Sequence, residues 1–167
     1  TGPWDNVEVA WEYDGVFDST TSQGHGIAVD PMNRVWAGSF GKVGIHVMNP
    51  DGTPAAFSPI DMITVDGTEY DIAGVGGCRG MGVDADGNIL YAQNSKLFRI
   101  NSETGEGMAL WEGPGSLTAP SVDDEGFIYV GTVVGVSPIH VIDPNTFEKV
   151  QEIDLPGPPG YARGIAV

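Results

Sequence analysis

Positive charge is scarce in this sequence. Seven lysines and arginines stand against 23 aspartates and glutamates, which gives a net charge of −16 at pH 7. Nucleic acids and anionic membrane surfaces are bound through basic faces, so the composition excludes both as partners. The charge is typical of a soluble acidic protein, and we expect it to be extracellular or periplasmic.

Cysteine and long apolar runs are also lacking. Cys78 is the single cysteine, which excludes an internal disulfide and is compatible with a bacterial exported protein. No apolar run approaches the ~20 residues that cross a bilayer, so a membrane span is excluded. No basic and apolar leader opens the chain at Thr1. We therefore expect either that a signal has been removed or that the sequence begins inside a longer protein.

Glycine and proline are abundant, with 25 and 12 residues. This density of helix breakers leaves no apolar stripe of helical period and predicts an all-β protein. One short motif, an apolar strand ending in Val-Asp, occurs in four versions. They are Gly24–Asp30, Cys78–Asp84, Leu117–Asp123 and Ala162–Val167, the last without its Asp. A unit of short strands that recurs every ~40–55 residues predicts stacked or radially arranged β-units.

Each motif is followed by the same succession of predicted elements. A turn led by Asp and ended by Gly or Asn comes first, because these residues bond back to turn amides and tolerate positive φ. Second strands are expected at 34–38, 88–92 and 127–131, third strands at 44–48, 96–100 and 138–142, and fourth strands at 60–65, 108–111 and 149–155. Four antiparallel strands in each repeat form the blade of a β-propeller. The long linker 66–77 is expected to begin with a small hairpin turned at Val65–Thr68.

The sequence therefore predicts a single, partial β-propeller domain over residues 1–167. Its expected parts are a preceding outer strand and linker at 7–24, blades at 25–77, 78–116 and 117–160, and the start of another blade at 161–167. Complete propellers of the common kind have six to eight blades. The remaining blades would come from a longer chain or from oligomerisation.

The repeat resembles that of the NHL and virginiamycin-lyase-like propellers, which reads Gly-Ile-Ala-Val-Asp, a turn, Gly-Asn and Val-Tyr-Val. Gly26–Asp30 with 35–36, and Gly80–Asp84 with 87–91, carry the resemblance. It implies a propeller fold but selects no function. Such folds host lyases, lactonases, peptide-amidating lyases, binding modules and interaction scaffolds.

Four residues at one repeat position are the candidate site. They are His25, Arg79, Thr118 and Arg163, each four residues before the Val of its motif. The first strand of each propeller blade lines the central channel, so we expect these residues to form part of a ring at one channel mouth. Cationic donors in an acidic protein focus an anionic group, and arginines clamp carboxylates with two hydrogen bonds. The alternative is that they pair with acids and hold the blades in register.

The main hypothesis is a secreted propeller that binds a protein or a small anionic ligand through its channel face, with no required cofactor. The second is a metal-assisted lyase or hydrolase acting on an anionic small molecule or peptide, with His25 as a ligand of zinc or calcium. The resemblance supports His25 as a zinc ligand, because peptide-amidating lyase propellers have a zinc-binding histidine just before the equivalent strand. Arg79, Thr118 and Arg163 depart from that pattern. A plain structural repeat of a cell-surface protein is the third hypothesis.

Other chemically notable residues are expected to be structural. His46 and His140 share a place on third strands, Cys78 is a small packed residue, and Asp84–Asn88 is a β-turn that lacks the ligand spacing of a calcium loop. Three aromatic residues fall at the same second-strand position in the alignment of the repeats and are expected to form inter-blade core. They are Trp36, Tyr91 and Tyr129.

Overall fold

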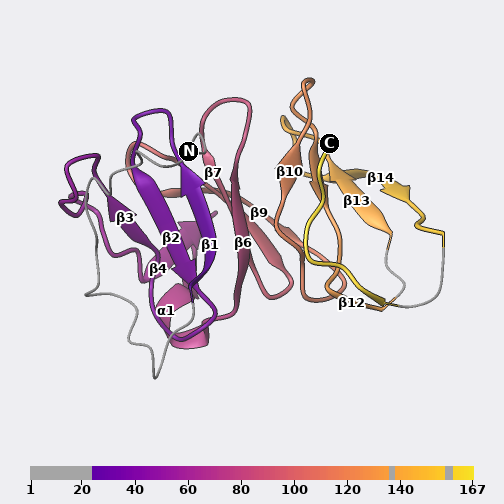
Figure 1. Cartoon of the computed structure of the whole chain (residues 1–167), viewed down its shortest axis with the longest axis horizontal. Helices are drawn as coiled ribbons and strands as arrows, with labels where there is room; N and C mark the ends of the chain where they lie inside the picture. The colour runs from indigo at the N-terminus through magenta and orange to yellow at the C-terminus, as the bar shows by residue number, and fades with distance from the viewer. Residues whose placement is uncertain (1–23, 136–137, 157–159) are drawn as a thin grey trace, which may run out of the picture.

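The computed structural model describes residues 24–135, 138–156 and 160–167. Three β-sheets follow one another in chain order across the molecule (Figure 1). The outer strand of a preceding blade, expected at the start of 7–24, lies outside the described residues. Within the described ranges, no helix is long and apolar enough to cross a membrane.

The first sheet has three antiparallel strands. They are β1 (Gly24–Val29), β2 (Val35–Ser39) and β3 (His46–Met48), in that order. The expectation of a fourth strand at 60–65 was wrong for this sheet, because only isolated bridges join Ile45 to Ile60 and Met48 to Pro54. Prolines at 54 and 59 have no backbone N–H to donate, so a continuous ladder beside β3 is interrupted there.

The segment after the first sheet forms the hairpin that its turn residues predicted. Strands β4 (Met62–Val65) and β5 (Thr68–Asp71) pair through a two-residue turn. Asp66 and Gly67 in this turn have φ angles of 49° and 77°, as a hairpin with a two-residue loop requires. The short helix α1 (Ile72–Val75) follows. The side chain of Asp71, just before this helix, accepts a hydrogen bond from the backbone N–H of Gly74. The linker is thus ordered structure, and Ile72 of α1 is buried in the core shared by the first two sheets.

The second and third sheets each have four antiparallel strands, which confirms the predicted partial propeller architecture. The second contains β6 (Cys78–Val83), β7 (Ile89–Gln93), β8 (Lys96–Ile100) and β9 (Gly107–Glu112). The third contains β10 (Ser121–Val122), β11 (Ile128–Val130), β13 (Ile139–Ile142) and β14 (Lys149–Ile153). A separate two-stranded ladder joins β12 (Val134–Gly135) to β15 (Gly160–Tyr161).

Hydrophobic cores fill the two spaces between successive sheets. Trp36 and Val47 from the first sheet pack with Tyr91 and Phe98 from the second. Leu90 and Leu97, on the opposite face of the second sheet, pack with residues of the third sheet that include Ile128 and Ile142. Alternation of side chains along β7 therefore supplies both cores from one strand.

The strand registers correct one prediction about the aromatic residues. Trp36 pairs with Ala28, and Tyr129 pairs with Ser121, so these two aromatics are equivalent. Tyr91 pairs with Met81, which puts it one residue further along its strand and on the opposite face. A shift of one residue reverses the face of a side chain. Tyr91 faces the first sheet, whereas the residue equivalent to Trp36 is Leu90.

The Asp that ends each first strand organises the turn after it. In all three sheets its Oδ1 accepts two backbone N–H groups of the turn, as expected for Asp30, Asp84 and Asp123. The second oxygen binds side chains. Asp30 Oδ2 accepts from Arg34 Nε at 2.7 Å and from Trp36 Nε1 at 2.9 Å. Burial alone would raise the pKa of Asp30, but these hydrogen bonds outweigh it and hold the pKa below its usual value.

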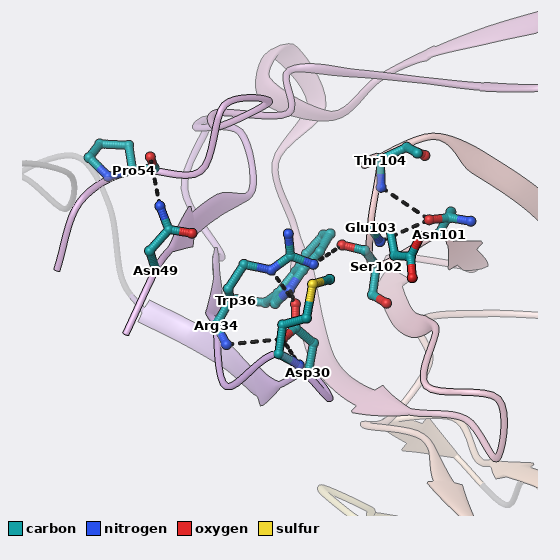
Figure 2. Close-up of polar contacts among 10 residues, drawn as sticks. Asp30, Arg34, Trp36, Asn49, Pro54, Asn101, Ser102, Glu103 and Thr104 are labelled. Carbon is teal, nitrogen blue, oxygen red and sulfur yellow. Dashed lines mark hydrogen bonds and ion pairs between the residues drawn. The ribbon is translucent and has the colours of Figure 1, made fainter. Parts of the chain in front are cut away.

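Two arginines extend these Asp contacts into the neighbouring sheet. Arg34 bridges Asp30 and the Ser102 carbonyl, which lies in the turn between β8 and β9 (Figure 2). Arg99 forms an ion pair with Asp84 (Nε–Oδ2 2.8 Å) and donates to the Pro144 carbonyl at 2.7 Å. That carbonyl lies in the turn between β13 and β14. The same kind of contact therefore joins the first sheet to the second and the second to the third.

Candidate functional site

The first strands of successive sheets are neighbours, since β1 contacts β6 and β6 contacts β10 (Figure 1). Glycine makes this approach possible. A Cβ atom on Gly26 would come within 3.1 Å of the Gly80 backbone, and one on Gly80 would clash with Ala119. The glycines of the repeated motif thus serve the contact between neighbouring first strands.

His25 and Arg79 precede these glycines and occupy the same irregularity in their strands. The register shifts between Gly24 and Gly26 in β1, and between Cys78 and Gly80 in β6. Each shift leaves one extra residue, so both side chains are carried by β-bulges. Bulges redirect side chains and are frequent next to functional sites.

Phe40 connects the two bulges. The His25 and Phe40 ring centroids are 5.9 Å apart, and Arg79 Cζ lies 4.8 Å from the Phe40 ring centroid. Phe40 itself is 42% exposed, and His25 is exposed. The result is a cluster of a histidine, an aromatic ring and a guanidinium at the surface, within reach of solutes.

Arg79 carries a charge that no acid of the described residues neutralises. Its Nη2 donates to the Ser116 hydroxyl at 3.2 Å, and its Nε is buried without a hydrogen-bond partner. Four of the seven lysines and arginines form ion pairs among the described residues, namely Arg34, Lys96, Arg99 and Lys149. In a chain with 23 acidic residues, a guanidinium held by an aromatic ring and a hydroxyl is free to receive an anion.

The other two candidate residues are placed differently. Thr118 is fully buried, and its hydroxyl accepts from the Gly131 N–H at 3.0 Å and donates to the Ala119 carbonyl at 3.2 Å. Its polar group is used within the fold. Arg163 is exposed near the end of the chain, after β15, and no described contact links it to the cluster. The structure therefore brings His25 and Arg79 together and leaves Thr118 and Arg163 apart from them.

Phe40 and Ser116 are members of the cluster that sequence reasoning missed. Both lie in connecting segments, after β2 and after β9. Connecting segments do not follow the repeat, so the alignment of motifs carried no signal for them. The phenyl ring of Phe40 was visible in the sequence only as an isolated aromatic.

The prediction that His46 and His140 are structural is supported for His140. His140 is buried, with its ring centroid 5.3 Å from that of Trp111 on β9 and its Nδ1 3.4 Å from Glu152 Oε1. Burial lowers the pKa of both His46 and His140, against the opposing effect of a nearby acid. Among residues 24–135, 138–156 and 160–167, no group of three or more His, Cys, Asp or Glu side chains is arranged to hold a metal ion.

Cys78 is buried between the first two sheets, as expected for a packed residue. Burial raises the pKa of its thiol to about 11, against the weaker lowering effects of hydrogen bonds and of Arg79.

We expect the Cys78 thiol of native protein at pH 8 to react with iodoacetamide about 100-fold more slowly than that of urea-unfolded protein, because only the thiolate attacks. Mass spectrometry of timed samples measures both rates. Equal rates would contradict a buried, protonated thiol.

Comparison with known proteins identifies the fold. Neither family models nor curated proteins give a match. Among solved structures, the chain matches a catalytically inactive variant of virginiamycin B lyase from Staphylococcus aureus, determined with quinupristin, at 19% identity and a TM-score of 0.65. The match covers 89% of this chain and 46% of that one. The fold is that of a β-propeller.

Two further solved structures are similar to this propeller. A streptogramin B lyase is 20% identical, with a TM-score of 0.60 over 81% of this chain and 41% of that one. A putative gluconolactonase is 18% identical, with a TM-score of 0.53 over 83% and 50%. The propeller thus spans half or less of the length of these structures. The resemblance to virginiamycin-lyase-like propellers is confirmed, and at these identities it concerns the fold alone.

Proposed function

We propose that this propeller is a secreted, non-catalytic scaffold that binds an anionic ligand at its first strands, with Arg79 as the principal contact. The observation that carries the proposal is the state of the Arg79 guanidinium. It is partly buried, stacks on Phe40 and has no acidic partner among the described residues. A guanidinium offers a planar set of donors that matches a carboxylate or phosphate.

The neighbouring residues support this assignment. His25 adds a second group able to donate a hydrogen bond, with its ring centroid 5.9 Å from that of Phe40. The overall charge of −16 repels anions from most of the surface, so the unpaired cations decide where an anion can settle. Arg163 is a further donor in the proposal only if a larger ligand reaches it. Thr118 has no part in it.

Anion binding is tested with trifluoroacetate, titrated into the full chain and followed by fluorine NMR. We expect Arg79→Gln to weaken binding at least about tenfold, because a hydrogen bond to a charged group contributes about 1.5–3 kcal/mol. Lys96→Gln is the matched control. It removes the same charge from a side chain that is paired with exposed Glu112, and we expect no change. Equal binding by wild type and Arg79→Gln would refute the proposal.

A metal-assisted lyase or hydrolase is the second candidate, favoured by a histidine and a guanidinium that both lie against Phe40. In this reading His25 holds zinc or calcium, and Arg79 neutralises a substrate carboxylate. Further metal ligands would have to come from outside the described residues. Calorimetric titration with zinc separates the two candidates. Binding that His25→Gln abolishes would favour the enzyme, whereas zinc-independent anion binding favours the scaffold.

A further inference from the structure

A histidine lies in the core between the second and third sheets. His140 pairs with Val130 and stands two residues before Ile142 on β13, so its side chain shares the face of these two core residues. It is 2% exposed, and its ring centroid lies 5.3 Å from that of Trp111 on β9. The imidazole is therefore enclosed at the contact between two sheets.

The repeat shows that an apolar ring fits this place. The third sheet has His140 opposite Val130. At the equivalent position of the second sheet, Phe98 lies opposite Tyr91 and is fully buried in the core shared with the first sheet. Packing alone is thus satisfied by a phenyl ring, whereas His140 adds a group that can take up a proton.

The surroundings of this imidazole offer little to stabilise a positive charge. Its Nε2 is buried without a hydrogen-bond partner among the described residues. Its Nδ1 lies 3.4 Å from Oε1 of Glu152, a carboxylate that is 45% exposed and also accepts from Lys149. The remaining titratable side chains of β9 and β11 are paired with other residues. They are Glu112, which pairs with Lys96, and Tyr129, which donates to Asp123.

These contacts favour the neutral form of the ring. Burial lowers the pKa of His140 and Lys149 acts in the same direction, whereas Glu152 opposes them. In the unfolded chain the imidazole is in water and keeps the ordinary histidine pKa of about 6.5. The unfolded state therefore takes up a proton first as pH falls. The stability contributed by neutral His140 is fully present above about pH 6.5 and is lost as pH falls through the lowered pKa of the folded state.

We propose that His140 makes the contact between the second and third sheets acid-sensitive, so that proton uptake opens this contact while the first two sheets stay packed. The proposal is independent of the anion site at Arg79. Its local character follows from the position of the ring, which lies against Trp111 beside the second core. Among the described residues, the first core contains none from the third sheet. Opening of the third sheet therefore leaves that core intact.

The test compares wild type with His140→Phe, which inserts the residue that the second sheet has at the equivalent position. Hydrogen–deuterium exchange of peptides covering β13 is measured by mass spectrometry, in the full chain, at pH 8 and at about pH 5.5. The ratio of wild-type to variant exchange rates cancels the intrinsic effect of pH on exchange. We expect this ratio to rise severalfold on acidification, with a ceiling of about tenfold for one proton at one pH unit below the ordinary histidine pKa.

Two further variants make the result specific. His46 has the equivalent position in the first sheet, opposite Ala37, and burial lowers its pKa as well. His46→Phe should leave the acid response of β13 unchanged, because the proposed opening does not involve the first sheet. Glu152→Gln removes the carboxylate that opposes the effect of burial, and should extend the response to lower pH. Circular dichroism at pH 8 checks that each variant is folded.

Three results would overturn the proposal. A ratio that stays constant or falls on acidification means that His140 contributes no acid sensitivity. Loss of the β13 response in His46→Phe means that the sheets open together rather than at this contact. Loss of the response in Glu152→Gln assigns it to that carboxylate. If His140→Phe does not fold, His140→Gln, which takes up no proton at these pH values, replaces it in the same comparison.

Discussion

Asp30→Asn is expected to destabilise the protein by about 3–5 kcal/mol, as removal of one partner from a buried ion pair does. The Asp30 side chain is fully buried, and its Oδ2 accepts from both Arg34 Nε and Trp36 Nε1. These two nitrogens can only donate. An asparagine that keeps its oxygen on the turn amides turns its NH₂ group toward two other donors. Urea unfolding, followed by circular dichroism, measures the loss.

Asp123→Asn is the matched control for this prediction. Asp123 holds the same turn in the third sheet, but its second oxygen accepts from the Tyr129 hydroxyl at 2.9 Å. A hydroxyl can rotate and accept from the new NH₂ group, and no cation is left unpaired. We therefore expect a clearly smaller loss of stability. Similar losses in both variants would mean that turn capping, rather than the Asp30 charge network, accounts for the effect.

The strands and turns could be predicted because their signals are local. Val-Asp followed by Gly or Asn marked each first turn, and the left-handed φ angles of Asn33 and Gly87 show why those residues stand there. The turn at Asp66 and Gly67 was visible for the same reason. The absence of a fourth strand from the first sheet was not foreseen. The apolar residues at 60–65 fit a strand whether it pairs with β3 or, as observed, with β5.

Which face of a sheet a side chain occupies was harder to predict than where the strands lie. Aligning Tyr91 with Trp36 by their aromatic character ignored a difference of one residue in position. A shift of one residue along a strand moves a side chain to the opposite face of the sheet, and here into a different hydrophobic core. The bulges at His25 and Arg79 present the same difficulty, because an extra residue changes the direction of a side chain without altering the sequence motif.

The candidate site was predicted in part. The sequence placed His25 and Arg79 at one repeat position, and the structure brings them together around Phe40. The sequence did not show that the Thr118 hydroxyl is hydrogen-bonded to the Gly131 N–H and the Ala119 carbonyl. It also did not show which cations are already paired. Arg34 and Arg99 use carbonyl groups 68 and 45 residues away, and a backbone carbonyl has no sequence signature.

Arg99→Met is expected to cost about 3–5 kcal/mol of stability, comparable to the loss from Asp30→Asn. The substitution leaves the Asp84 carboxylate, whose side chain is 1% exposed, without its cation. It also removes the donor to the Pro144 carbonyl and the guanidinium that lies 4.9 Å from the Phe147 ring centroid. The contact between the second and third sheets should weaken, and urea unfolding of the full chain measures the change.

A second substitution identifies the cause of that loss. In the Arg99→Met background, Asp84→Asn removes the stranded charge, so the double variant should be destabilised by less than the two single losses combined. Lys96→Met, which breaks an exposed ion pair on the same strand, should cost less than about 1 kcal/mol. Strict additivity in the cycle would show that Arg99 acts only through its contacts with the Pro144 carbonyl and the Phe147 ring. Coupling would show that the Asp84 carboxylate holds the Arg99 guanidinium, which donates to the Pro144 carbonyl of the neighbouring sheet. Arg79 forms no such pair with an acid of the described residues, and its guanidinium is therefore available for a ligand.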